Sequence, residues 1–183
     1  MDRLIILDNF ITQKKYFESI SKSPFWGDQS YYWHSMDNLD RGIGSWVVER
    51  ILQTSAKNFF PFEKACGFEY WPGVISHEDE LLDVGIDGEN YHLNIHVDKD
   101  EILYEETGEF SFPLFGAILY FLEEDIEGGL LRYWVDEHTY KDIECKNNRL
   151  IVFDPSCPHG VTQVTKGVRK ALSINFWEQK LYG

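Results

Sequence analysis

Residues 91–98 read YHLNIHVD, a strict alternation of apolar and polar side chains that predicts a β-strand. One face of this strand would carry Tyr91, Leu93, Ile95 and Val97, and the other His92, Asn94, His96 and Asp98. A polar face made only of ligand-type side chains is unusual. The pattern predicts an imidazole and a carboxylate side by side, and the alternative is a polar face that only meets water.

The second half of the chain continues in β-like segments separated by turn signals such as Glu127-Gly128-Gly129. Many short strands at this spacing predict a sandwich or a jelly roll. The further segments are Phe112–Leu122, Leu130–Val135, Arg149–Asp154, Gly160–Val164 and Lys170–Trp177. Around the last of them, one strand face would carry Arg169, Ala171, Ser173, Asn175 and Trp177.

The first third of the chain mixes helix-like and strand-like segments. It is predicted to form a strand at Leu4–Leu7, helices at Thr12–Ser21 and Ile43–Ser55, and a strand at Phe68–Trp71 that stops at Pro72-Gly73. We therefore expect one domain over residues 1–183, mainly β with N-terminal helices (α+β). Residues 1–65 would be a mainly helical support, and residues 66–183 a jelly-roll core.

Composition and charge exclude several classes of protein. The chain has 183 residues and a net charge of −14, which argues against binding to nucleic-acid phosphates or to an anionic membrane. No apolar run approaches the ~20 residues of a membrane helix, and Leu4–Leu7 is too short for a signal peptide. Three cysteines without close pairing, Cys66, Cys145 and Cys157, predict a reducing, cytoplasmic setting.

A third residue of metal-ligand type, His159, follows the pair His96 and Asp98 along the chain. Two histidines and one carboxylate form a facial triad, which leaves coordination positions of an iron ion open. The HxD tripeptide alone carries little weight, because His77-Glu78-Asp79 is a second example in an acidic stretch that reads as a surface loop. The other histidines, His34 and His138, have no partner at a ligand spacing.

The residues around these ligands extend the pattern. HVD at 96–98 is followed by Leu119-Tyr120-Phe121-Leu122, by Gly128-Gly129, by His159 and, ten residues later, by Arg169. Over residues 90–178 the chain therefore resembles the Fe(II)/2-oxoglutarate-dependent dioxygenases, and within them the prolyl 4-hydroxylase-like branch. The resemblance implies a double-stranded β-helix, the cupin-like form of the jelly roll.

The resemblance also implies roles for single residues. His96, Asp98 and His159 would bind Fe(II) and form the catalytic centre. Arg169 would hold the far carboxylate of 2-oxoglutarate, which suits a planar guanidinium that forms bidentate hydrogen bonds. Relatives often have a serine two residues after the basic residue; here that position is Ala171, and Ser173 is the next hydroxyl on the same strand face.

A tyrosine that assists the basic residue is less clearly placed. Tyr120 fits the tyrosine of the strand after HxD, but the alignment is ambiguous by one residue. If Phe121 points inward, Tyr120 points away, because a shift of one residue changes the face. Tyr70 and Tyr104 are then alternatives, and each reads equally well as an ordinary core or surface aromatic residue.

The implied reaction oxidises an unactivated C–H bond of a small molecule or a peptide side chain. It uses O2, releases succinate and CO2, and has ascorbate in a supporting role. From His77 to Glu109 the chain carries twelve acids and one lysine, so an acidic mouth would disfavour nucleic acids and accept a neutral or cationic group, unless these acids are only a solvated face. The aromatic stretch 25–33 is read as packing of the helical layer rather than as a lid.

Three other functions stay open at this level. A cupin-like iron enzyme that does not use 2-oxoglutarate would have no need of Arg169. A non-catalytic jelly-roll binding protein would have no need of three metal ligands on one inner face. A nucleobase demethylase of the same superfamily would need a basic patch, which the charge of −14 opposes.

Overall fold

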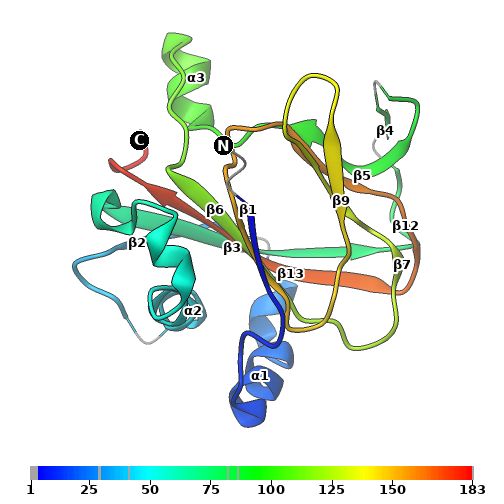
Figure 1. Ribbon diagram of the computed structural model, residues 1–183, viewed down its shortest axis with the longest axis horizontal. Helices are drawn as coiled ribbons and strands as arrows, with labels where there is room; N and C mark the ends of the chain where they lie inside the picture. The colour runs from blue at the N-terminus through cyan, green and yellow to red at the C-terminus, as the bar shows by residue number, and fades with distance from the viewer. Residues whose placement is uncertain (1–3, 29, 41, 82, 86, 183) are drawn as a thin grey trace.

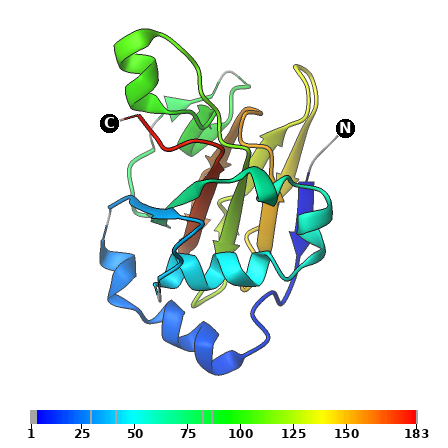
Figure 2. The same cartoon turned by 90° about the vertical axis from the view of Figure 1, so that its left-hand side faces the viewer.

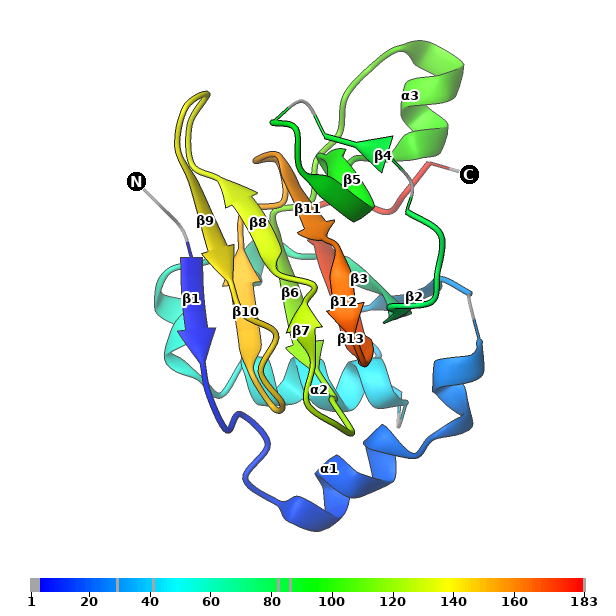
Figure 3. The ribbon, with the colours of Figure 1, turned by 90° about the vertical axis from the view of Figure 1, so that its right-hand side faces the viewer.

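The computed structural model of the protein describes residues 4–28, 30–40, 42–81, 83–85 and 87–182 and consists mainly of two antiparallel sheets that face each other (Figures 1 and 3). The major sheet has the order β1 (Leu4–Leu7), β10 (Leu150–Phe153), β6 (Phe115–Tyr120), β13 (Val168–Trp177), β3 (Gly67–Ser76) and β2 (Tyr32–Ser35). The minor sheet has the order β4 (Asp83–Val84), β5 (Asn90–His96), β11 (His159–Thr162), β8 (Leu131–Trp134) and β9 (Tyr140–Ile143). A further pair joins β12 (Val164–Lys166) to β7 (Glu127–Gly128). This is a double-stranded β-helix with N-terminal helices, so the predicted fold class is confirmed.

The N-terminal helices cover the side of the major sheet that faces away from the minor sheet (Figures 2 and 3). They are α1 (Lys14–Ser21), α2 (Ile43–Ile51) and the short 3₁₀ helices η1 (Pro24–Gly27), η2 (Ser55–Asn58) and η3 (Phe62–Lys64). Val47, Val48 and Ile51 of α2 have no exposed surface, so burial of apolar area holds this layer to the sheet. Within the described ranges no helix is long and apolar enough to cross a membrane.

The central strand β6 separates two cores. Phe115 and Leu119 belong to the core under the helices, whereas Ile118 and Tyr120 belong to the core between the two sheets. All six residues of β6 are buried, as expected for a strand that is covered on both faces. The alternation along β6 therefore decides which side chains reach the space between the sheets.

Three strand predictions were wrong in their limits, and the first is Phe112–Leu122, which is reduced to Phe115–Tyr120 in β6. β3 continues through Pro72 to Ser76, because β2 pairs with β3 only from Gly67 to Tyr70 and leaves the later residues on a sheet edge, where a proline is tolerated. The predicted strand Gly160–Val164 is divided between β11 and β12.

The third helix, α3 (Glu101–Thr107), projects from one end of the sheets (Figure 1). The carboxylate of Asp100 accepts a hydrogen bond from the backbone N–H of Leu103 at 3.0 Å, which caps the helix N-terminus. Gly108 ends the helix with a φ of 75°, the left-handed conformation that favours glycine.

Candidate metal centre and adjoining pocket

The register between β13 and β3 sets the inner face of the major sheet. Residues directly opposite each other in a sheet point to the same face. The pairs that line the space between the sheets are Arg169 with Ile75, Ala171 with Gly73, Ser173 with Trp71, and Asn175 with Glu69. The predicted polar face of the last strand therefore points into the molecule, with a guanidinium at one end and an amide at the other.

The minor sheet supplies the opposite wall, and a bulge changes its alternation. His159 and Val161 of β11 are two residues apart, but their partners His96 and Leu93 on β5 are three apart. One extra residue in β5 shifts the side chains after it to the other face. Leu93 therefore lines the cavity together with His96, and the prediction that all apolar residues of this strand share one face was wrong.

His92 lies at a second register shift of β5, where the adjacent residues Val161 and Thr162 pair with Leu93 and Tyr91. Its ring does not lie beside His96 in the cavity: Nδ1 accepts a hydrogen bond from the backbone N–H of Val164 at 2.9 Å, and Nε2 lies 3.2 Å from the carbonyl oxygen of Asp79. His92 is a buried structural residue that ties β5 to β12.

His96, Asp98 and His159 come together at the outer end of the cavity. Nε2 of His96 lies 3.3 Å from Oδ1 of Asp98, and Nε2 of His159 lies 3.7 Å from Oδ2 of the same carboxylate. The three ligand atoms lie within 4.8 Å of one another, and they are the one group of this kind among the described residues. This donor set of two imidazoles and one carboxylate is the one that suits a divalent iron with open positions.

Backbone carbonyls orient both imidazoles. Nδ1 of His96 donates to the carbonyl oxygen of Asn94 at 2.7 Å, and Nδ1 of His159 donates to that of Cys157 at 2.9 Å. A carbonyl oxygen only accepts, so the proton sits on Nδ1 and the lone pair on Nε2 in each neutral ring. Both lone pairs therefore point to the space beside the Asp98 carboxylate, where a metal ion held by all three residues would bind.

The charges of the triad are set by burial and by its members. Burial lowers the pKa of His159, which keeps this ring neutral and able to bind a metal. Burial opposes ionisation of Asp98, but His96, His159 and Asn175 outweigh it, so the pKa of this carboxyl lies below its usual value. The unloaded triad thus already holds one negative charge beside at least one neutral imidazole.

Asn175 supports the carboxylate and was missed as a functional residue from the sequence. Its Nδ2 donates to Oδ2 of Asp98 at 3.0 Å, and its side chain is almost fully buried. The backbone N–H of Asp98 also donates to the carbonyl oxygen of Pro155, which ties the ligand to the segment before His159. The sequence indicated that Asn175 shares a strand face with Arg169, but it did not indicate that Asn175 bonds to Asp98.

Arg169 lies at the inner end of the same cavity, which has a volume of about 90 Å³. The side chain is 4% exposed, and Nη2 lies 3.4 Å from the hydroxyl of Tyr120, with the guanidinium 5.1 Å from the centre of that ring. Its Nε has no hydrogen-bond partner, and no carboxylate of the described residues forms an ion pair with it. A buried cation without a counter-charge is costly, so this site fits a ligand that brings a carboxylate.

The Gly128-Gly129 pair allows two strands to approach each other closely. Both residues have a positive φ, 75° and 62°, which glycine adopts without strain. A Cβ on Gly128 would lie 2.0 Å from the carbonyl oxygen of Gln163, and one on Gly129 would lie 2.9 Å from Cγ2 of Val164. The pair therefore lets β7 pass close to β12.

Two of the residues that were predicted to bind the cosubstrate together with Arg169 reach the cavity, namely Tyr120 and Ser173. Tyr120 points inward to Arg169, and Phe121 points to the helical layer, where it stacks on Phe17. Ser173 lines the cavity and lies between Arg169 and Asn175 along β13. The register ambiguity is thus resolved in favour of Tyr120.

Tyr70 does not reach the cavity, and its assignment to the cosubstrate is corrected. Its ring lies in the core under the helices, where it stacks on Tyr32 with ring centres 5.1 Å apart. The cause is strand parity: Glu69 and Trp71 take the inner face of β3, so Tyr70 takes the outer one. Tyr104 lies on α3 under the ammonium group of Lys99, also outside the inner cavity.

A wider cavity of about 670 Å³ opens in front of the triad. It shares His96, Asp98, Trp71 and Asn175 with the inner cavity, so the two are continuous. Glu69 lies in this mouth and was not singled out from the sequence. Burial raises the pKa of Glu69 to about 7, although hydrogen bonds from Trp177 and Asn175 lower it.

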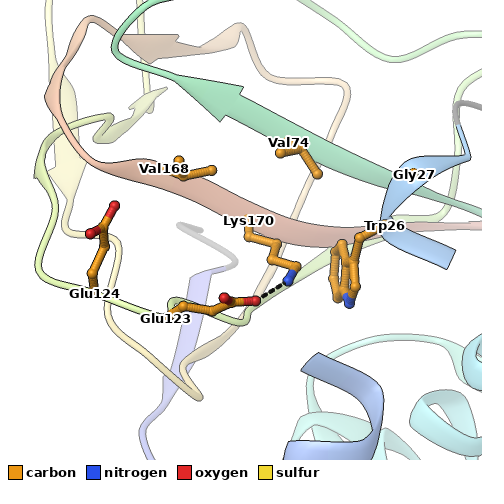
Figure 4. Close-up of a pocket in the computed structure, with 7 residues that line it drawn as sticks. All are labelled: Trp26, Gly27, Val74, Glu123, Glu124, Val168 and Lys170. Carbon is orange, nitrogen blue, oxygen red and sulfur yellow. Dashed lines mark hydrogen bonds and ion pairs between the residues drawn. The ribbon is translucent and has the colours of Figure 1, made fainter. Parts of the chain in front are cut away.

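Another cavity, of about 630 Å³, lies on the outer side of the major sheet (Figure 4). Lys170 spans it: its Nζ donates to the carbonyl oxygen of Ser21 at 2.7 Å and to the carboxylate of Glu123, and lies 5.1 Å from the ring centre of Trp26. Lys170 is adjacent to Arg169 in β13 and so points to the opposite face. These contacts of Lys170 tie the N-terminal layer to the sheet, and the cavity shares no lining residue with the two cavities at the triad.

The other histidines and the cysteines form no second site in the described ranges. His77 lies in a turn near the carbonyl oxygen of Gly167, as its loop assignment predicted. His34 stacks on Phe68 and Tyr70. The cysteines are free thiols.

Comparison with known protein families adds an independent result. The family model of the 2OG-Fe(II) oxygenase superfamily matches residues 82–178, a range that contains the triad and Arg169. A search of the curated proteins found none that matches this sequence.

Solved structures share the fold at low sequence identity. A prolyl-4-hydroxylase of Pseudomonas putida is 13% identical, with a TM-score of 0.60 over 98% of this chain and 95% of that one. An oxidoreductase of the 2OG-Fe(II) oxygenase family from Burkholderia pseudomallei is 9% identical, with a TM-score of 0.55 over 97% and 86%. NgTET1, solved in complex with 5mC DNA, is 13% identical, with a TM-score of 0.55 over 96% and 72%. At these identities the likeness shows a common fold.

Proposed function

Because the chain belongs to the 2OG-Fe(II) oxygenase superfamily, and is therefore a 2-oxoglutarate-dependent non-haem iron dioxygenase, we propose that it hydroxylates an unactivated C–H bond at an iron held by His96, Asp98 and His159. The proposed substrate is a small molecule or a peptide side chain. The proposal places the far carboxylate of 2-oxoglutarate on Arg169.

One observation carries this proposal: a convergent triad and a buried, uncompensated guanidinium line one cavity. The Nε2 atoms of both imidazoles are available to a metal ion, and Arg169 is available to a carboxylate. A cupin-like iron enzyme without 2-oxoglutarate gives no reason for the arginine, and a binding protein gives no reason for the triad. Both alternatives leave half of the cavity unexplained.

Each residue has a defined task in this proposal. When bound, iron and 2-oxoglutarate supply the oxidising chemistry, in which O2 is consumed and succinate and CO2 are released. Arg169 and the hydroxyl of Tyr120 fix the far end of the cosubstrate, and Ser173 offers a further hydroxyl between them and the triad. The apolar side chains of Leu131 and Phe153 line the same cavity and keep water away.

The mouth of the cavity supports a substrate other than nucleic acid. Glu69, Asp100 and Glu101 line it, and Lys99 is already paired with Glu101 at 2.8 Å. Phosphate groups would be repelled at this surface. The fold shared with NgTET1 therefore does not carry a DNA substrate over to this chain.

Anaerobic titration of the purified protein with Fe(II) and then 2-oxoglutarate tests the proposal. We expect a visible charge-transfer band of a chelated keto acid. In Arg169→Ala the same band requires at least about tenfold more 2-oxoglutarate, because charge-assisted hydrogen bonds contribute roughly 1.5–3 kcal/mol.

Arg50→Ala, an arginine on the outer side of α2, is the matched control and leaves the titration unchanged. Bound iron without a band would contradict the use of this pocket for 2-oxoglutarate. Failure of the wild type to bind iron would contradict the assignment of the triad.

A further inference from the structure

The primary substrate has to approach the triad from the mouth. The inner cavity ends at Arg169, whereas the mouth begins at His96 and Asp98 and is about seven times larger by the volumes of about 670 and 90 Å³. Residues that line the mouth but not the inner cavity are therefore the ones that meet the primary substrate alone. Glu69 and Tyr31 are among them.

Glu69 is a largely buried acid that has no counter-charge among the described residues. Oε1 accepts a hydrogen bond from Nε1 of Trp177 at 3.2 Å, and Asn175 lies directly opposite on β13. No lysine or arginine of the described ranges forms an ion pair with Glu69. A largely buried carboxylate without a cation is costly, so the position favours a cationic ligand group.

Aromatic rings stand beside this carboxylate. Trp71 shares the inner face of β3 with Glu69, and its ring centre lies 5.0 Å from that of Tyr31. Tyr31 lines the same cavity as Glu69 and Asp98, and burial and the charges of these two carboxylates raise the pKa of its phenol. Aromatic faces attract cations, so the rings and Glu69 favour the same kind of group.

The loaded site leaves the charge of Glu69 uncompensated. The charges of Fe(II), Asp98, 2-oxoglutarate and Arg169 cancel when all four are present. Elsewhere in the mouth, Lys99 pairs with Glu101, and Asp100 accepts hydrogen bonds from the backbone N–H groups of Leu103 and Tyr182. Glu69 is thus the carboxylate of the mouth that a substrate can neutralise.

We propose that Glu69 determines substrate specificity and that the primary substrate presents a cationic group, an ammonium or a guanidinium, to Glu69, Trp71 and Tyr31. This inference rests on the proposed function, since it places the substrate in front of the triad. Both a small amine and a basic peptide side chain carry this chemistry.

Matched pairs of probes test the proposal. N-acetyl-lysine methylamide and N-acetyl-norleucine methylamide represent a peptide side chain, and pentylamine and pentanol represent a small molecule. Binding is measured calorimetrically under anaerobic conditions on protein loaded with Fe(II) and 2-oxoglutarate. We expect the cationic member of at least one pair to bind about tenfold more tightly than the neutral member. The pair that shows it identifies the source.

Substitutions assign the preference to its residues. Glu69→Gln keeps an acceptor for Trp177 and should reduce the preference to less than about twofold. Trp71→Leu should weaken the cationic probe by about threefold, the usual size of a cation–π contact at a partly exposed site. Glu105→Gln, an exposed acid on α3 outside the mouth, should leave the preference intact.

Two outcomes overturn the proposal: no cation preference in the wild type, including no binding of either cationic probe at millimolar concentration, or a preference that survives Glu69→Gln. The charge-transfer band is recorded first in each preparation. A missing band reports failure of the proposed function, whereas an intact band without a cation preference reports failure of this inference alone.

Discussion

The triad and the two charged residues that flank it, Arg169 and Glu69, differ in the partners that the protein itself provides for them. His96, Asp98 and His159 have partners within the chain: carbonyl oxygens hold the two rings, and Asn175 holds the carboxylate. Arg169 at the inner end and Glu69 at the mouth have no ionic partner among the described residues. The metal site is therefore preorganised, and the flanking charges await ligands.

This difference has an energetic meaning. Removing a triad ligand should abolish iron-dependent turnover without making the folded protein more stable. Removing a flanking charge should relieve a cost in the ligand-free protein, because unpaired buried charges destabilise the folded state. Stability and function should thus change in opposite directions at the flanks, which is the usual trade-off at a binding site.

The largest expected effect is at the triad. Replacing His96, Asp98 or His159 by Ala should abolish iron-dependent formation of succinate, because two remaining ligands do not hold Fe(II) in an open facial site. Iron content and succinate are measured together, and circular dichroism checks the fold. His138→Ala, an exposed histidine in the loop between β8 and β9, is the control and should keep both. Wild-type turnover in any of the three variants would contradict the ligand assignment.

The next effect distinguishes the inner end from the triad. Arg169→Met should lower the affinity for 2-oxoglutarate about a hundredfold, since two charge-assisted hydrogen bonds are lost, and should leave iron affinity nearly unchanged. Without ligands, this variant should unfold at a denaturant concentration equal to or above that of the wild type. In the wild type, 2-oxoglutarate with Mn(II) in place of iron should raise the melting temperature; in Arg169→Met it should not.

A clear loss of stability in ligand-free Arg169→Met would contradict the contrast between the triad and its flanks. It would mean that the hydrogen bond to Tyr120 and the contacts of the guanidinium already outweigh its burial.

The sequence predicted much of the triad and little of its surroundings. His96 and Asp98 are close in sequence, and only His159 has to be brought from a distant segment. The structure brings the three side chains together. The alternation of residues 91–98 also predicted the strand, but not the bulge that turns Leu93 to the cavity side. A bulge depends on the partner strand, so the pattern of one strand does not reveal it.

Glu69 and Tyr70 show the same limit from the other side. Adjacent residues of a strand point to opposite faces. One face of β3 packs against the helices, and the other lines the cavity. The sequence alone does not show which of two adjacent residues of β3 faces the cavity. The prediction therefore named Tyr70 and not Glu69. The deciding fact is the register that pairs Glu69 with Asn175, which only the folded sheet contains.

The smallest expected effect concerns the pH dependence of stability at the mouth. The pKa of Glu69 rises from its ordinary 4.5 to about 7 in the folded protein, mainly because of burial. Stability that this residue provides below pH 4.5 is therefore lost as the pH rises through about 7, where the folded state has to hold the charge. Glu69→Gln removes this loss, so metal-free variant and wild type should be about equally stable at pH 4.5 and should differ by about 1 kcal/mol at pH 8, after allowance for partial exposure.

Urea unfolding of both proteins at several pH values measures this difference, with Glu105→Gln, which removes an exposed acid outside the mouth, as the control. A gain for Glu69→Gln that grows with pH, together with the loss of cation preference, would show that the mouth gives up stability to hold a charge for its substrate. A Glu69→Gln variant that is less stable than wild type at pH 8 would instead make Glu69 a structural partner of Trp177, and the contrast with the triad would then apply to Arg169 alone.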